Sequence, residues 1–138
     1  MDKFKTWVEL KILWRKLTHK KIIFVTLDGF RKDKVDFCPT LKSYADESIV
    51  FSNMMTVAPY TLAAHHAMFS GMYPSRNGVN AYYNMFRFKK NEIQTIPQFL
   101  SEIGFYTCCD IINDVVIPTE GFDEVNIFDE KTVDFKKH

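Results

Sequence analysis

Apolar residues gather in short runs along the chain, and turn residues separate these runs at regular intervals. Residues 22–27 (IIFVTL) form a continuous apolar run rich in β-branched side chains, which predicts a strand buried on both faces of a parallel sheet. The runs at residues 49–57 and 105–111 predict a second and a third strand.

Three segments between and beside these runs have the end signals of helices. Pro39–Asp46 carries Pro in its first turn, and Thr61–Ser70 is followed by Gly71 as a C-terminal stop. Residues 95–103 begin at a threonine suited to the N-cap and end before Gly104. Strands that alternate with helices indicate βαβ units, so the sequence predicts an α/β fold: a three-layer αβα sandwich with a mostly parallel central sheet.

Residues 1–20 are expected to form a separate, basic amphipathic helix. Their Trp and Leu residues recur at spacings of three, four and three, which places them on one helical face, and residues 1–21 hold seven Lys or Arg against two acidic residues. Such a helix can lie on an anionic membrane surface or pack on its own domain. Packing is the favoured interpretation, because Trp and Leu stripes usually belong to a core. Residues 110–138 have the opposite balance, with eight acidic residues against three Lys.

Composition narrows the class of protein. The chain has 138 residues, 46% hydrophobic and 25% charged, which suits one globular domain. A formal net charge of +1 excludes a strongly basic nucleic-acid binder. The three cysteines show no zinc-ligand spacing and no disulfide framework, and no apolar run is long enough to span a membrane. These features, with no signal-peptide pattern, predict a cytoplasmic location.

Candidate chemistry lies at the ends of two predicted strands, where open α/β sheets bind ligands. Asp28 follows the first strand, and its carboxylate is a natural ligand for a hard metal ion or, alternatively, an ordinary residue of an Asp-Gly turn. Thr61 stands where a helix begins and is either a nucleophile beside the helix dipole or an N-cap. His65 is four residues later and therefore on the same helical face; ordinary packing or surface exposure is the alternative for His65 and for His66.

The order of motifs distinguishes these alternatives. LDGFRKD is followed by PTLKSYADESIVFSNMMTVAPYT, TLAAHHAMFSGMYPSRNGV, FLSEIGFYT and GFDEV. This series resembles the N-terminal part of the sulfatase family, within the alkaline phosphatase superfamily, from about residue 21 to about residue 124. The resemblance implies an alkaline phosphatase-like fold, Asp28 as a metal ligand, Thr61 as nucleophile and metal ligand, and His65 in the place of the basic residue that follows the nucleophile.

The departures from the family pattern concern the nucleophile and its neighbours. Sulfatases proper convert a Cys or Ser to formylglycine, which Thr61 does not give, and Gly29 replaces the second aspartate of their Asp-Asp pair. Ala64 stands where relatives have a Ser or Asn that holds a substrate oxygen. Threonine and the Asp-Gly-Phe-Arg sequence resemble the phosphodiesterases and phosphotransferases of the superfamily, whose intermediate is a phosphothreonine.

The resemblance implies a metal-dependent hydrolase or transferase that acts on an anionic phosphate or sulfate ester. The divalent ion is zinc, manganese, calcium or magnesium, and its further ligands lie in the C-terminal half of longer family members. Residues 21–138 are therefore expected to be the N-terminal part of a catalytic domain that binds metal weakly or not at all by itself. The alternative is a non-catalytic remnant or binding module, and an in-frame Asp-His pair downstream of His138 would favour the enzyme. The sequence leaves the oligomeric state open.

Overall fold

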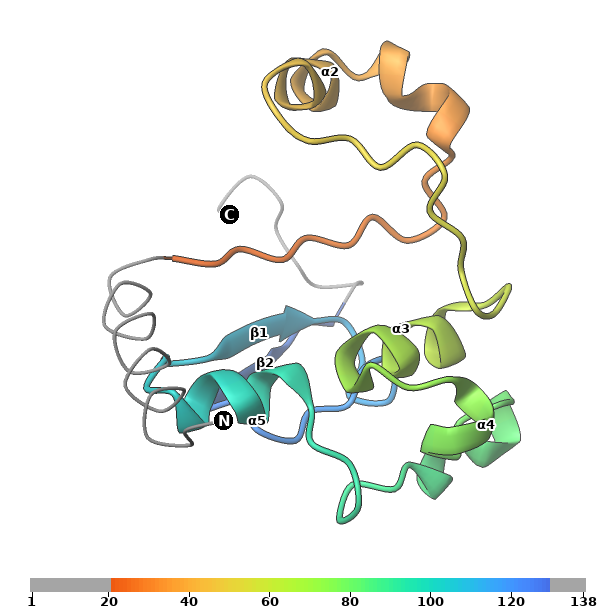
Figure 1. The fold of residues 1–138 in the computed structure, drawn as a ribbon, viewed down its shortest axis with the longest axis vertical. Coiled ribbons are helices and arrows are strands. Elements are labelled where there is room, and N and C mark those ends of the chain that lie inside the picture. The colour runs from red at the N-terminus through yellow and green to blue at the C-terminus, as the bar shows by residue number, and fades with distance from the viewer. Residues whose placement is uncertain (1–20, 130–138) are drawn as a thin grey trace, which may run out of the picture. The chain divides into compact units, whose positions relative to one another are not determined.

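The computed structural model describes residues 21–129, which divide into two compact units: Ile22–Thr56, and Lys21 with the described part of Val57–His138. Each unit is described by itself below (Figure 1). The helix expected at residues 1–20 lies outside the described residues. Within the described range, the model contains no helix with both the length and the apolar character needed to cross a bilayer.

The unit Ile22–Thr56 contains two short helical elements joined at a cysteine. The 3-10 helix η1 spans Lys32–Phe37, and the α-helix α2 spans Pro39–Asp46 with the extended residue Cys38 as its N-cap. Pro39 occupies the first turn, where a missing amide hydrogen costs nothing, so α2 has the bounds that the sequence predicts. Lys42 Nζ lies 3.7 Å from Asp36 Oδ1 and connects the two elements.

The prediction of a strand at residues 22–27 is wrong. These residues are not assigned to a strand, and their apolar side chains are exposed, up to 84% for Ile23. Residues 49–57 likewise carry turns and bends in place of the second predicted strand. An apolar run indicates that a segment tends to be buried. A strand also needs a neighbouring strand to which it is hydrogen-bonded, and the run does not show whether such a neighbour exists.

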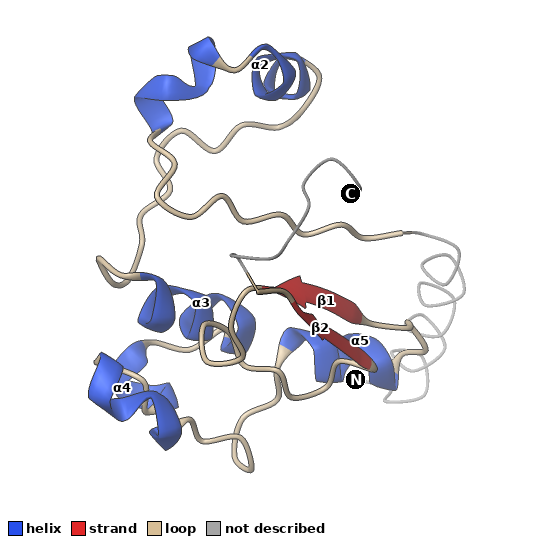
Figure 2. Ribbon diagram, turned by 180° about the vertical axis from the view of Figure 1, so that it is seen from behind, coloured by secondary structure: helices blue, strands red, loops and turns tan. Residues whose placement is uncertain are grey.

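The second unit contains the sheet and most of the helices (Figures 1 and 2). Its elements follow in the order α3 Thr61–Ser70, α4 Pro74–Asn77, η2 Tyr82–Arg87, α5 Ile96–Glu102, β1 Cys108–Ile111 and β2 Glu124–Ile127. Helix α5 has the predicted Thr95 as its N-cap, in a reciprocal capping box with Gln98. Helix α3 packs on α4, α5 and η2, which makes it the central helix of the unit.

Strands β1 and β2 form a two-stranded parallel sheet, with Cys108 opposite Glu124 and Ile111 opposite Ile127. Strand β1 falls inside the predicted run at residues 105–111, whereas β2 was not predicted. The register is fixed just before the strands by Asp123, whose Oδ2 accepts hydrogen bonds from the amide of Thr107 at 2.7 Å and from its hydroxyl at 2.9 Å. Residues 21–129 thus contain helices and one small parallel sheet, in agreement with an α/β fold, while the three-layer sandwich stays a prediction.

The core lies beneath one face of α3. Its fully buried apolar side chains include Leu62 and Val79, and its buried polar residues include His66, Asn77 and Thr95. Buried polar groups require hydrogen-bond partners, and these residues bond mainly to backbone groups of neighbouring turns. The core therefore fixes both the helix α3 and the loops that surround it.

Candidate active site

Helix α3 begins at Thr61, directly after an extended residue. Tyr60 has φ −145° and ψ 152°, occupies the N-cap position and accepts a hydrogen bond at its carbonyl oxygen from the Ala64 amide at 3.2 Å. Thr61 is therefore the first helical residue rather than the cap. The amides of the first helical turn have no carbonyl partner within the helix, and the helix dipole is positive there, so an anion beside Thr61 would meet favourable groups.

The sequence favours a helix here because Ala-rich TLAAHHAMFS contains no β-branched residue after its first position. The helix ends at Gly71, which has φ 64°, a left-handed conformation that glycine adopts without steric cost. Both bounds agree with the sequence prediction. The end signals thus fix where Thr61 stands along the helix.

Two faces of α3 carry different chemistry. Thr61 and His65, four residues apart, share one face, and both are half-buried. Leu62, His66 and Ser70 follow each other on the face that packs into the core. The predicted pair Thr61 and His65 therefore lies together on the face that is not the core face.

His65 is held by a loop that follows strand β1. Its Nδ1 atom lies 3.3 Å from the carbonyl oxygen of Val116. A carbonyl oxygen only accepts hydrogen bonds, so this contact requires the proton on Nδ1 and leaves Nε2 available on the other side of the ring. His65 can thus present Nε2 to a ligand while its ring is oriented by the protein.

His66 has a different environment, which the sequence did not distinguish from that of His65. Only 4% of its surface is exposed, its Nδ1 lies 2.8 Å from the Leu62 carbonyl oxygen, and its ring meets Phe88 edge-on with centroids 5.2 Å apart. Burial lowers the pKa of His66, and the hydrogen bond to Leu62 opposes that effect in part. Because the Leu62 carbonyl oxygen only accepts hydrogen bonds, the neutral ring of His66 carries its proton on Nδ1.

Aromatic side chains flank the start of α3. The rings of Tyr60 and Tyr82 lie with their centroids 5.2 Å apart and their planes at 32°. Tyr82 belongs to η2, which packs on α3, and 60% of its surface is exposed. The residue before Thr61 is thus supported by an aromatic contact that leaves one ring open to solvent.

The loop after α3 is fixed by polar residues that the sequence reasoning missed. Ser70 donates from its hydroxyl to the His66 carbonyl oxygen, and Asn77, fully buried, accepts from the Val79 amide at 2.9 Å. At Gly78, with φ 94°, an added Cβ would overlap the Arg87 carbonyl oxygen. The motif YPSRNGV signals this turn, since Asn-Gly pairs favour left-handed backbone, but not its buried contacts.

Asp28 lies in the unit Ile22–Thr56, in the turn after residues 22–27. The Phe30 amide donates to the Leu27 carbonyl oxygen at 3.3 Å, and Gly29 has φ 67°, so Asp28 and Gly29 form the centre of a turn. Asp28 is exposed. Because Asp28 and Thr61 belong to different units, each is placed only within its own unit, and their convergence on one pocket stays a prediction.

The predicted metal site is incomplete within the described residues. In residues 21–129, His, Cys, Asp and Glu side chains form no group of three that could hold a metal ion. Asp28 and Thr61 offer oxygen atoms, which hard divalent cations prefer, but protein metal sites use three or more protein ligands. The two residues therefore fit such an ion by the type of ligand and not by the number of ligands.

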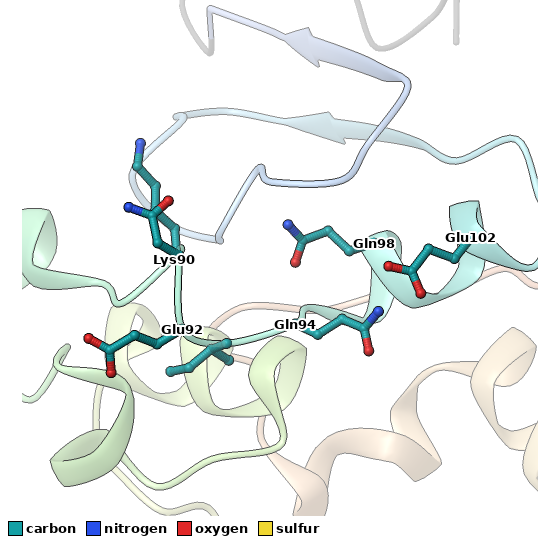
Figure 3. A pocket seen from close by; sticks show the side chains of 7 residues that line it. Lys90, Glu92, Gln94, Gln98 and Glu102 are labelled. Carbon is teal, nitrogen blue, oxygen red and sulfur yellow. The ribbon is translucent and has the colours of Figure 1, made fainter.

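The described residues of the second unit line cavities at two places that bear on the site. One, of about 310 Å³, lies between the loop 90–94 and helix α5; Figure 3 shows that its labelled side chains, among them Glu92 and Gln94, point in different directions rather than toward one another. The other, of about 240 Å³, is lined by His66 and by residues of the segments 85–90 and 114–120. Neither Thr61 nor His65 lines either cavity.

Comparison with known proteins gives one match. The family model described as Sulfatase matches residues 20–134, most of the chain. No curated protein and no solved structure matches significantly. The matched range includes Asp28, Thr61 and His65.

Proposed function

Because the chain belongs to the sulfatase family over residues 20–134, we propose that it acts in the hydrolysis of phosphate or sulfate esters with Thr61 as the nucleophile. The observation that carries this proposal is the place of Thr61 as the first residue of α3, with His65 one turn later on the same face. An anionic ester near Thr61 would be attracted by the helix N-terminus. Threonine in place of a formylglycine precursor favours phosphate over sulfate as the transferred group.

The proposed reaction has two steps. The Thr61 Oγ forms a bond to the phosphorus or sulfur atom, the bond to the leaving oxygen breaks, and the alcohol departs with a proton. Water then cleaves the threonine ester, which restores the hydroxyl group and releases phosphate or sulfate from a monoester, or a phosphate monoester from a phosphodiester. Charge on the transferring group would be stabilised by the amides of the first turn of α3.

His65 is proposed to bind the ester or its leaving oxygen through Nε2. The contact of Nδ1 with the Val116 carbonyl oxygen supports this role, since it leaves Nε2 as the ring atom available to a ligand. In the neutral ring Nε2 accepts a proton or a hydrogen bond, and in the protonated ring it donates one. His65 could thus assist the departure of the leaving group without leaving its place on α3.

Asp28 and Thr61 are proposed as two ligands of a divalent ion, with zinc, manganese, calcium and magnesium as the alternatives. Members of the sulfatase family generally use such an ion. When bound, it would supply Lewis acidity at the ester and favour the ionised threonine hydroxyl. Its remaining ligands are proposed to come from outside residues 21–129, in keeping with residues 21–138 as the N-terminal part of a catalytic domain.

The experiment that tests Thr61 is covalent trapping. The chain is incubated with a 4-nitrophenyl phosphodiester or 4-nitrophenyl sulfate and one divalent metal at a time, quenched in acid and digested for mass spectrometry. We expect a phosphoryl group that still carries the second ester substituent of the phosphodiester, or for the sulfate substrate a sulfuryl group, on the peptide that contains Thr61. The isosteric variant Thr61→Val should lose the adduct, and Thr61→Ser should retain it. An adduct that persists in Thr61→Val would contradict the proposal, and complete absence of an adduct would favour the non-catalytic alternative.

A further inference from the structure

The cavity of about 240 Å³ lies on the core side of α3, away from the face that carries Thr61 and His65. Its lining is mixed: apolar side chains, among them Phe88, Ile117 and Pro118, lie beside polar and charged ones. This volume is below the range of cavities that take drug-sized ligands, so it suits a small molecule with an apolar body. The segments that line it belong to one unit, so its shape does not depend on the other unit.

His66 is a buried polar residue in this lining. Its Nδ1 bonds to the Leu62 carbonyl oxygen, so in the neutral ring Nε2 is a hydrogen-bond acceptor. Among the described residues, Nε2 has no hydrogen-bond partner, although 96% of the residue is buried. A buried acceptor without a partner is costly, and a ligand that donates a hydrogen bond in the cavity would remove that cost.

The charged groups around the cavity favour a cation. Two carboxylates, Glu120 and Asp114, line it against one cation, Lys90. Glu120 is the more enclosed partner of an ion pair with Lys90, since their side chains are 28% and 62% exposed and the charged atoms are 3.8 Å apart. The backbone of Glu120 is fixed, because Thr95, almost fully buried, donates from its hydroxyl to the Glu120 carbonyl oxygen at 2.7 Å.

We infer that this cavity binds a small primary ammonium compound with an apolar body. The ammonium group donates one hydrogen bond to His66 Nε2 and pairs with the carboxylate of Glu120, while the apolar part packs on Phe88 and Ile117. Lys90 is mostly exposed and can leave Glu120 for solvent when the ligand enters. The site is separate from the proposed nucleophile, so its test does not depend on whether the chain hydrolyses esters.

The probe for this site is benzylammonium, added to the 138-residue chain at neutral pH and followed by NMR. We expect saturable shifts at residues 85–90 and 114–120 and a change of the His66 Nε2 nitrogen signal. Benzyltrimethylammonium keeps the charge without a donor, benzyl alcohol keeps a donor without the charge, and benzoate reverses the charge. Each should bind about tenfold more weakly or worse, because each loses one of the two polar interactions or meets repulsion.

Variants separate the two polar contacts. Glu120→Gln should weaken benzylammonium about tenfold, Lys90→Met should bind it at least as tightly as wild type, and Glu102→Gln, outside the cavity, should change nothing. His66→Gln should also bind weakly; if that variant does not fold, Glu120→Gln decides the question. Absence of saturable shifts, or equal affinity of Glu120→Gln and wild type, would overturn the inference.

Discussion

The Nδ1 atom of His65 lies 3.3 Å from the carbonyl oxygen of Val116, a residue 51 positions later in the chain. This contact joins the helix that begins at Thr61 to the loop that follows strand β1. It orients the ring without a carboxylate partner, so the side chain is placed by backbone geometry alone. A substitution in the 112–118 loop should therefore alter the position of the His65 ring more than the position of Thr61.

The first prediction concerns the convergence of Asp28 and Thr61. Two ligands of one ion lie on the order of 3–5 Å apart, because metal–oxygen bonds are about 2.0–2.6 Å. Titration with Mn²⁺ should therefore broaden the NMR signals of both residues together, even when binding is weak. Asp28→Asn should remove the broadening at Thr61, whereas Asp33→Asn, an exposed carboxylate of the same unit, should leave it. Broadening at only one of the two residues would argue against a shared ion and against the proposed site.

The second prediction concerns turnover. Asp28 and Thr61 are the two metal ligands proposed above, and two ligands are too few for tight binding, so the 138-residue chain should bind zinc, manganese or calcium weakly and hydrolyse 4-nitrophenyl esters slowly. Removal of a nucleophile lowers kcat strongly, so Thr61→Val should lower any metal-dependent rate at least ~10²-fold, and Thr61→Ser should keep part of it. Calorimetric titration and release of 4-nitrophenol measure the two quantities. Rapid metal-dependent turnover by this chain would show that further ligands are not needed.

The third prediction is a pH dependence of stability that originates in His66. Burial lowers its pKa in the folded protein below the ordinary value of 6.5, so the unfolded chain binds the proton more readily. The free energy of unfolding should therefore be largest above pH 6.5 and fall as the pH decreases through that value. Urea unfolding at several pH values measures this slope.

The variant His66→Phe should reduce that slope, because it fills the same space beside Phe88 without a titrating group. The control is Val79→Ala, which removes buried apolar atoms and lowers stability but keeps the imidazole. It should retain the wild-type slope. An unchanged slope in His66→Phe would assign the pH dependence to other groups.

The fourth prediction compares two glycines with left-handed backbone. Gly71→Ala meets open space and should cost about 1 kcal/mol of stability, the strain of positive φ alone. Gly78→Ala should cost about 3 kcal/mol or more, because its Cβ would also overlap the Arg87 carbonyl oxygen. Urea unfolding of the two variants gives the difference. Equal losses would mean that the backbone near Arg87 yields without cost.

Local signals explain which parts of the fold could be predicted. Pro39 and Gly71 mark the ends of α2 and α3 through their own backbone restrictions, and both helices have the predicted bounds. The pair Thr61 and His65 shares a face simply because helical residues four apart are neighbours. Such features depend on a few consecutive residues, so the local sequence is sufficient to predict them.

Features that depend on distant residues were not predictable in the same way. The pairing of β2 with β1 is set in part by Thr107 and Asp123, which lie 16 residues apart and carry no pattern that identifies a partnership. His65 and His66 are identical side chains in adjacent positions, and only the packing of α3 on its neighbours makes one buried. Non-local pairing and the choice of the buried face therefore had to come from the structure.

The segment at residues 22–27 has a consequence for the behaviour of the protein in solution. Its backbone runs as an extended trace (Figure 1), it is rich in β-branched residues, its side chains are open to solvent, and the structure assigns it to no sheet within residues 21–129. Such a segment is a template on which an identical segment of another molecule can add as a neighbouring strand. Self-association should therefore rise steeply with protein concentration, and a charged residue at Val25, in the middle of the segment, should keep the protein monodisperse at concentrations where the wild type aggregates.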